Sequence, residues 1–392
     1  MTSFLLRLKR FCGFIVGIVF FLSGIIKLMD PVGAGLVMDE YYSFLHLNFL
    51  SFSAKVMGTL FALAETIVGV ALVTGVWKRI IAWIALGMQI FFTLITLILL
   101  IFNPQMDCGC FGEAIHLTHL QTFIKNLILL VLLLAYLIPP KHLMIECKIR
   151  KYVVFYLVST SALAFTVYSW IYIPMVDFTA YRPGAELAAG VSINPEEMYE
   201  SVFTYEKDGR QETFTLEDLP DSTWTFVSTE TRMKNDQFKD LIELSFYKVQ
   251  TGEYMDTLAT EGKVMIVSVY DTDMRKSRWD DVESFTEASK EQGFTTMLLC
   301  AQEDGIPEKM KDFAYISDYK TLISMNRSNG GVTYFNDGVL IRKWARICAP
   351  DPDELEEIMI TDSTEVSIAR ESKGSLGFQG FLLYVSAVLL LL

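Results

Sequence analysis

The chain has 392 residues, of which 52% are hydrophobic, and yet its formal net charge is −13. The acidic balance argues against a nucleic-acid partner, which would need a basic surface, and six scattered cysteines are too few for a disulfide scaffold. The first 174 residues or so are largely apolar, whereas the acidic residues are concentrated after them. This contrast predicts a membrane domain followed by a soluble domain.

Five apolar runs are long enough to cross a bilayer as helices, since about 20 residues span its hydrocarbon core. No small-residue cleavage site follows the first run, so we interpret it as a span rather than a signal peptide. Tyrosines and phenylalanines between the first two runs predict a helix at the membrane interface, within residues 31–53. The predicted spans are approximately residues 11–29, 56–76, 80–102, 120–138 and 152–173.

Lysine and arginine residues indicate the orientation of these spans. They precede the first span, separate the second from the third, and separate the fourth from the fifth. If the spans alternate, all three basic segments lie on one face, which the positive-inside rule makes cytoplasmic. The sequence therefore predicts a multi-pass protein of the bacterial inner (cytoplasmic) membrane, in contact with lipid, with its large domain on the periplasmic side.

A pair of cysteines, Cys108 and Cys110, follows the third span on the external face. Gly109 between them lets the backbone bend far enough for the two to form a disulfide, because glycine has no Cβ. A bond that closes so small a ring is expected to be strained and easily reduced, and labile disulfides are usually catalytic or regulatory. The oxidising side of a membrane is also where such a bond persists.

Three interpretations of this loop remain open. Cys108 and Cys110 can be a redox dithiol, which the spacing, the glycine and the oxidising side favour. They can instead bind zinc together with His116 and His119, although the spacing is unlike the common zinc frameworks. The third interpretation is a disulfide that only shapes the loop. We expect the two cysteines to pair with each other rather than with a metal.

Two ionisable residues within the predicted spans are candidate binding residues. Glu65 falls near the middle of the second span, where a carboxylate is costly unless it is protonated or has a partner. Gln89 and Thr93 of the third span can supply hydrogen bonds, and a neutral packing role explains Glu65 equally well. Lys27 lies near the outer end of the first span, where its long side chain can reach the interface.

Three short motifs occur in order within residues 10–140, at the end of the first span, in the second span and after the third. They are Ser23-Gly24-Ile25-Ile26-Lys27-Leu28-Met29-Asp30-Pro31, Glu65-Thr66-Ile67-Val68-Gly69 and Asp107-Cys108-Gly109-Cys110-Phe111-Gly112. Together they resemble the DoxX-like superfamily, and most closely its branch that includes the methylamine utilisation protein MauE. The resemblance implies a four-helix membrane unit linked to thiol or electron chemistry, and in MauE to maturation of a periplasmic, disulfide-rich partner. Because this chain adds a fifth span and a large domain, methylamine metabolism itself does not follow.

After the fifth span, the chain shows the alternating strands, helices and turns of a soluble α/β domain. Asp208-Gly209 between two strand-like runs predicts a hairpin. Helical patterns at about 274–292, 306–313 and 351–361 separate or follow four further strands, in an order that resembles the thioredoxin fold at about residues 255–362. The four strands are Val264–Tyr270, Phe294–Cys300, Val332–Phe335 and Val339–Trp344.

The thiol chemistry of that fold is missing from this domain. Asp271 and the seven residues after it contain no Cys-x-x-Cys where catalytic members carry one. Gly330 and Gly331 stand where those enzymes place a cis-proline. We therefore expect a redox-silent domain used for docking or structure, in which Cys300 and Cys348 are separate thiols.

The predicted fold class is an α-helical transmembrane bundle, with four core helices and a fifth span, followed by an α/β thioredoxin-like periplasmic domain. Its parts are a DoxX/MauE-like domain at 1–140, a cytoplasmic loop and fifth span at 141–174, and the periplasmic domain at 175–375. The apolar segment at 376–392 is interpreted as a shortened sixth span or as a tail in the outer leaflet.

The predicted function is thiol–disulfide or electron exchange for maturation of an envelope protein, as an oxidoreductase or an accessory to one. The periplasmic client is not specified by the sequence, and a quinone is one candidate electron partner. The alternative is a non-enzymatic membrane scaffold, whose external domain binds a partner and whose disulfide is only structural.

Overall fold

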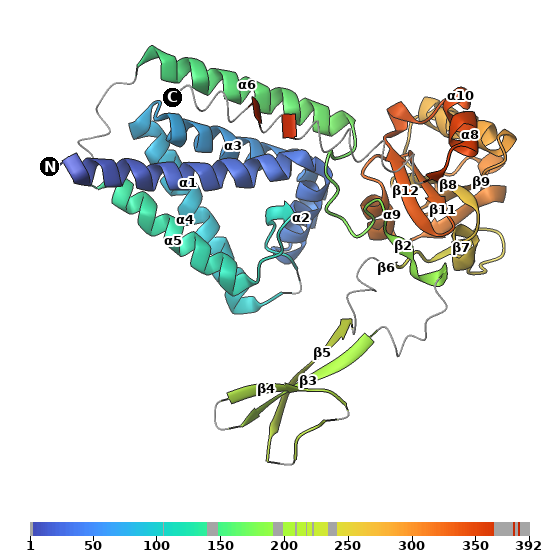
Figure 1. Ribbon diagram of the computed structural model, residues 1–392, viewed down its shortest axis with the longest axis horizontal. Coiled ribbons are helices and arrows are strands. Elements are labelled where there is room, and N and C mark those ends of the chain that lie inside the picture. Colours follow the sequence, from blue (N-terminus) through green and yellow to red (C-terminus); the bar gives the residue numbers. More distant parts are fainter. Residues whose placement is uncertain are drawn as a thin grey trace. The chain divides into compact units, whose positions relative to one another are not determined.

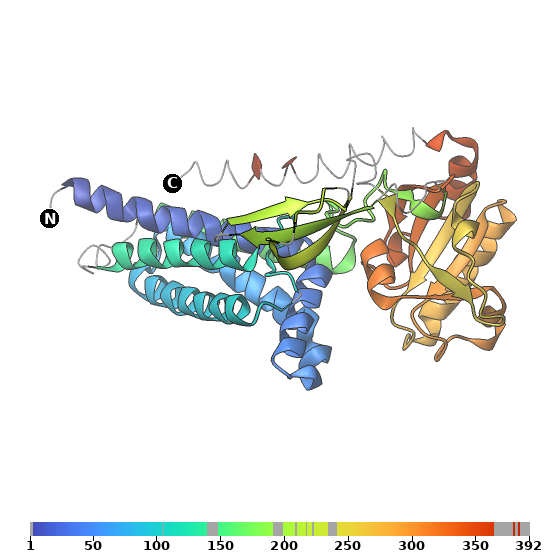
Figure 2. The same ribbon diagram turned by 90° about the horizontal axis from the view of Figure 1, so that it is seen from below.

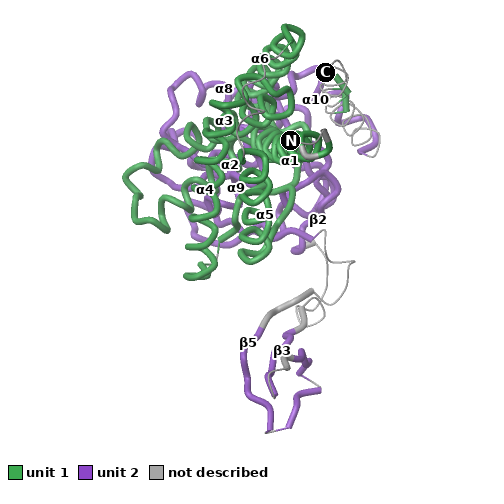
Figure 3. The backbone as a smooth tube through the Cα atoms, turned by 90° about the vertical axis from the view of Figure 1, so that its left-hand side faces the viewer, with its two compact units in different colours: residues 1–178, 369–392 green, residues 179–368 purple. Residues whose placement is uncertain are grey.

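The computed structural model describes residues 3–104, 106–138, 148–190, 199–207, 210–216, 218–221, 223–233, 241–363, 379–380 and 383–384. The chain divides into two compact units, residues 1–178 with 369–392 and residues 179–368 (Figure 3). The predicted tail at 376–392 lies almost entirely outside the described residues, as does the hairpin turn at Asp208-Gly209.

The first unit is a bundle of long apolar helices (Figure 1). Within the described residues, five helical segments are long and apolar enough to cross a membrane, which confirms the five predicted spans. The protein is therefore a multi-pass membrane protein. The helices are α1 (Ser3–Met29), α3 (Ala54–Thr74), α4 (Lys78–Phe102), α5 (His119–Leu137) and α6 (Ile149–Ile171).

Helices α1 and α3 approach closely because glycines lie where they meet. A Cβ on Gly69 would lie 2.7 Å from the carbonyl oxygen of Gly17, and one on Gly24 would lie 2.7 Å from that of Ala62. Small residues permit such contact between membrane helices, where close packing replaces the hydrophobic effect. Figure 2 shows the helices of this bundle lying side by side. The contact brings the first two sequence motifs together.

The segment between the first two spans is helical, as predicted. Asp30 caps the N-terminus of helix α2 (Pro31–Phe44), where its carboxylate accepts a hydrogen bond from the Gly33 N–H at 2.9 Å. Pro31 suits the first helical position, because a backbone N–H there would have no partner within the helix. The 3₁₀-helix η1 (Asn48–Ser53) then leads directly into α3. The interfacial position of this segment stays a prediction.

The second unit contains a mixed sheet, with strand order β6-β2-β12-β11-β8-β9-β10-β7 in the described residues. The parallel strands are β8 (Lys263–Val269), β9 (Thr295–Cys300) and β10 (Ala314–Ser317). β11 (Gly331–Asn336) pairs antiparallel with β8, and β12 (Val339–Trp344) pairs antiparallel with β11 on its other side. The four predicted strands are thus confirmed as neighbours in one sheet. The outer strands are β2 (Glu186–Leu187), β6 (Leu241–Ile242) and β7 (Phe246–Lys248).

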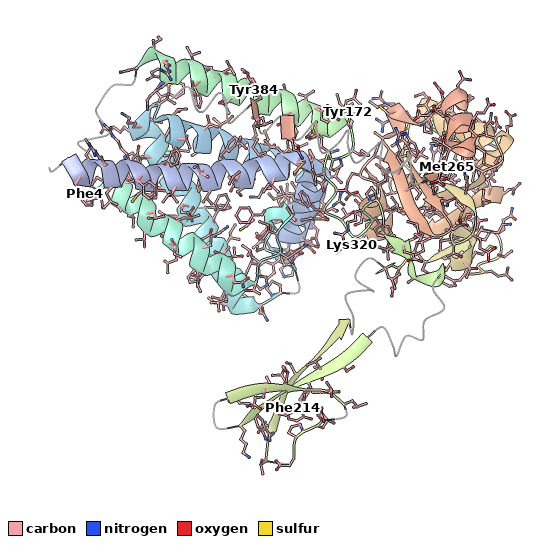
Figure 4. All side chains as sticks on the ribbon, viewed as in Figure 1. Phe4, Tyr172, Phe214, Met265, Lys320 and Tyr384 are labelled. Atoms are coloured by element: carbon pink, nitrogen blue, oxygen red, sulfur yellow. The ribbon has the colours of Figure 1, made fainter. Side chains whose placement is uncertain are left out.

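Helices cover both faces of this sheet. Successive side chains of β8 point to opposite faces and therefore pack into two different cores. Met265 (labelled in Figure 4) and Val267 pack with α8 (Lys276–Glu291) and α10 (Pro352–Ile360). Ile266 packs on the other side with α9 (Tyr319–Met325). The predicted helices near 274–292 and 351–361 are confirmed, whereas the one at 306–313 is a 3₁₀-helix, η6 (Glu308–Phe313).

A separate three-stranded antiparallel sheet has the order β4-β3-β5. Pairing of β3 (Tyr199–Lys207) with β4 (Arg210–Phe214) confirms the predicted hairpin, and β5 (Thr225–Met233) adds a strand that was not predicted. Aromatic side chains hold the three strands together: the Tyr205 ring lies 5.9 Å from Phe214 and 5.6 Å from Phe226 between centroids. Phe214 is labelled in Figure 4.

Candidate functional site

The three sequence motifs converge at one place in the helical bundle. Ser23 and Lys27 are four residues apart on α1, so their side chains lie on one face of that helix. The Ser23 hydroxyl donates to the Cys110 carbonyl at 2.7 Å and lies 3.2 Å from Oε1 of Glu65 on α3. Lys27 Nζ donates to Oε2 of Glu65 at 2.7 Å. Ser23 therefore connects the charged residues of the spans with the cysteine loop.

Lys27 and Glu65 form an ion pair that is largely removed from solvent. The Lys27 side chain is 17% exposed and the Glu65 side chain 6% exposed. A carboxylate at this depth needs a partner, and the expectation that Gln89 or Thr93 provides it is wrong. Gln89 donates instead to the Asn126 carbonyl, and Thr93 to the backbone of its own helix. Lys27 points to Glu65 rather than out to the interface.

The cysteine loop is fixed by backbone contacts on two sides. Gly109 has a φ of +61°, in the left-handed region that glycine adopts without strain, and a Cβ there would overlap Val37 of α2. The Tyr41 hydroxyl, also on α2, donates to the Cys108 carbonyl at 2.8 Å. The bend predicted at Gly109 is therefore present, and it lets the loop lie against α1 and α2.

The two thiols have different environments. Cys108 is 5% exposed, whereas Cys110 is only partly buried. A hydrogen bond from Cys110 lowers the pKa of Cys108 to about 5, helped by the Thr122 hydroxyl, which donates to Sγ at 3.0 Å, and opposed by burial. The same hydrogen bond and burial raise the pKa of Cys110 well above its usual value. These shifts favour the thiolate at Cys108 and keep the proton on Cys110. Neither sulfur is bonded to another among the described residues, and a disulfide between the two stays a prediction.

The two histidines of the loop have other partners than the cysteines. His116 Nδ1 lies 3.0 Å from Oδ2 of Asp107, with both side chains exposed, and His119 Nε2 donates to the Pro104 carbonyl at 3.0 Å. No group of three or more His, Cys, Asp or Glu side chains converges among the residues described. The four candidate zinc ligands are therefore not brought together.

A cavity of about 370 Å³ lies beside the thiols within the first unit. Cys108, Cys110, Lys27 and Glu65 all border it, and most of the remaining wall is aromatic or aliphatic. Sequence reasoning missed this cavity and the roles of Ser23, Tyr41 and Thr122. Of these, only Ser23 carried a usable signal, since it stands one helical turn before Lys27 in the first motif.

These features define a class of protein: a five-span membrane bundle with a buried ion pair and a cysteine loop at the edge of an apolar cavity. Residues 4–139, which hold the whole site, match the family model of the methylamine utilisation protein MauE. The predicted resemblance to MauE is thereby confirmed for this part of the chain, while the relationship to the wider DoxX-like superfamily stays a prediction.

A second family model, described as a domain of unknown function (DUF8463), matches residues 199–235. This segment corresponds to the three-stranded sheet of β3, β4 and β5. No curated protein and no solved structure matches the chain significantly.

Proposed function

We propose that the membrane unit carries out thiol–disulfide exchange through Cys108 and Cys110. The observation that carries this proposal is the unequal environment of the two sulfurs. In disulfide exchange, attack falls on the accessible sulfur, and the thiol of lower pKa leaves faster. Here Cys110 is the more exposed residue of the two, and the leaving group is Cys108, whose thiolate accepts a hydrogen bond from Thr122.

The exchange begins with a disulfide between Cys108 and Cys110. A client thiolate attacks Sγ of Cys110, forms a mixed disulfide with it, and releases Cys108 as a thiolate. The client's second thiol loses its proton and attacks the client sulfur of the mixed disulfide, which leaves a disulfide in the client and releases Cys110. Cys110 takes up the proton and ends as a thiol. Two electrons thus pass from the client to the cysteine pair, which ends in the dithiol state.

The client in this proposal is an envelope protein that requires a disulfide. A role in the maturation of such a protein is what the resemblance to MauE implies, and residues 4–139 match the model of that methylamine utilisation family. The distribution of basic residues supports a bacterial inner-membrane location, with the second unit on the periplasmic side. A thioredoxin-like core agrees with the pairing of β8 with β9 and β11, and the missing Cys-x-x-Cys after β8 fits a domain that holds a client without oxidising it.

The test is to trap thiol states in intact cells by acid quenching followed by alkylation. We expect Cys108 and Cys110 to occur in both oxidised and reduced forms. Replacing Cys108→Ala should leave Cys110 reduced and the client without its disulfide, because no Cys108–Cys110 disulfide remains for a client thiolate to attack. Cys300→Ala is the matched control, since Cys300 is a fully buried thiol of the second unit and burial raises its pKa to about 12. A Cys108–Cys110 pair that stays oxidised under every condition would favour the scaffold function instead.

A further inference from the structure

We propose that the cavity beside Cys108 and Cys110 binds a lipid-soluble quinone, which accepts the electrons that the pair takes from its client. This inference rests on the proposed function, because the exchange leaves a dithiol that must be reoxidised. It assigns the cavity a ligand class and gives Lys27 and Gln89 roles in binding.

The cavity has the size and wall of a site for a flat apolar ring. Its volume of about 370 Å³ falls within the range of small-molecule sites. Phe61 and Phe91, which border it, lie parallel to each other, with 6.1 Å between ring centroids and 3° between planes. Phe92 lies beside them, under the Lys27 ammonium. Aromatic faces of this kind pack well against another planar ring.

Gln89 gives an independent indication that a ligand binds here. Its side chain borders the cavity and is 0% exposed. Nε2 donates to the Asn126 carbonyl at 2.9 Å, but Oε1 is buried and has no hydrogen-bond partner among the described residues. Because an unsatisfied buried acceptor is costly, such a group calls for a donor. A quinol hydroxyl is a donor of the required kind, whereas a lipid acyl chain is not.

Lys27 complements Gln89 for the oxidised form of the ligand. The bond to Glu65 takes one of the three N–H donors of the Lys27 ammonium, which leaves two for other acceptors. A quinone carbonyl is an acceptor, and it gains negative charge as it is reduced. One wall of the cavity thus offers a cation to the quinone, and another offers an acceptor to the quinol.

The reoxidation step balances without any further reactant except water. Cys108 enters as a thiolate and Cys110 as a thiol, and a disulfide bond forms between their sulfurs. The two electrons released reduce the quinone. One proton comes from Cys110 and the second from water, so that both carbonyl oxygens become hydroxyls. The ligand class must therefore accept two electrons and two protons, as a quinone does.

The experiment uses the purified full chain in lipid nanodiscs, with ubiquinone-1 as the probe. Binding is measured on a protein in which Cys108 and Cys110 are both replaced by serine, so that it does not depend on redox chemistry. Reoxidation is measured on the reduced wild type as quinol formed per protein. We expect saturable binding and one quinol per cysteine pair.

Two substitutions on one helix provide a matched comparison. Ile95→Trp fills the cavity, whereas Ile98→Trp places the same ring one turn further along α4, at a side chain that is 38% exposed and does not border the cavity. Binding should be lost in the first variant and kept in the second. Gln89→Met removes the unpartnered acceptor with little change in side-chain volume. It should weaken binding of ubiquinol-1, the reduced form of the probe, about tenfold, as expected for one lost hydrogen bond.

The outcomes separate this inference from the proposed function. Absence of saturable ubiquinone-1 binding, or equal binding in Ile95→Trp and the wild type, overturns the quinone site, even where the pair exchanges with a peptide dithiol. Failure of Ile95→Trp to fold leaves Gln89→Met as the deciding variant, and unchanged binding there overturns the assignment of Gln89. If the double-serine protein binds ubiquinone-1 and the cavity variants abolish that binding, the quinone site is supported, whether or not the wild-type pair exchanges with thiols.

Discussion

The ion pair between Lys27 and Glu65 is expected to stabilise the bundle only as a pair. The two charged groups are 2.7 Å apart, and both side chains are well under one-third exposed. Glu65→Leu leaves the Lys27 ammonium buried without its counter-charge. Removal of one partner from a buried pair costs about 3–5 kcal/mol of unfolding free energy. Lys27→Met, which strands the carboxylate, should cost a similar amount.

The double variant, with Lys27→Met and Glu65→Leu together, should be more stable than either single variant. It removes both charges and with them the cost of their desolvation, and well-packed apolar replacements of buried pairs are often neutral or stabilising by about 1–4 kcal/mol. The non-additivity arises because the two residues share one interaction. A simple loss of packing volume would give costs that add.

Reversible unfolding in mixed micelles, followed by circular dichroism, measures these three free energies. Thr74→Val is a suitable control, since within the described part of the chain that buried hydroxyl donates to carbonyls of its own helix, and Thr74 does not border the cavity. Single-variant costs below about 1 kcal/mol, which is the range of exposed pairs, would refute the reasoning. So would a double-variant cost equal to the sum of the two single costs.

Three other predictions concern the cysteine loop and the orientation. In the reduced protein, thiolate absorbance should report ionisation of Cys108 near pH 5, with the thiol protonated below that pH and the thiolate present above it. The Cys110→Ala variant should shift this transition to higher pH, because it removes the main hydrogen bond to the Cys108 thiolate. Gly112→Ala should cost about 1–2 kcal/mol for its positive φ alone, since nothing surrounds a Cβ there, and Gly109→Ala should cost more in the same unfolding assay, because its methyl group also overlaps α2. A reporter fused after Pro183 should be active only outside the cytoplasm, and cytoplasmic activity would contradict the orientation.

The sequence was most informative where one segment alone determines the structure. A run of about 20 apolar residues has few alternatives to a span, so the five spans could be predicted with small errors at their ends. Buried runs such as Val264–Val269 likewise indicated central strands. The outer strands β2, β6 and β7 have only two or three residues, and their pairing depends on partners far along the chain. No local pattern predicts such strands.

Prediction of the site would have required knowledge of which helix faces meet. The sequence singled out Lys27 and Glu65 separately but did not predict their contact, because the two are 38 positions apart in the chain. A signal was present in the glycines: Gly17 and Gly24 are seven residues apart and share one face of α1, which is the face that α3 contacts. This spacing would have placed the second motif against the first. The cavity had no such signal, because its wall comes from helices α1 to α5 together with η1 and the cysteine loop.

Ser23 explains why the ion pair and the cysteine loop belong to one site. Its hydroxyl has a single proton and two acceptors within reach, the Glu65 carboxylate at 3.2 Å and the Cys110 carbonyl at 2.7 Å. A carboxylate is ordinarily the stronger acceptor, but Lys27 already donates to this one at 2.7 Å. The ion pair therefore leaves the Ser23 proton to the carbonyl, and that bond holds the backbone of Cys110 beside the thiolate of Cys108. In this arrangement a charge pair within the spans helps to determine the position of Cys110, whose sulfur is the point of attack in the exchange that we propose.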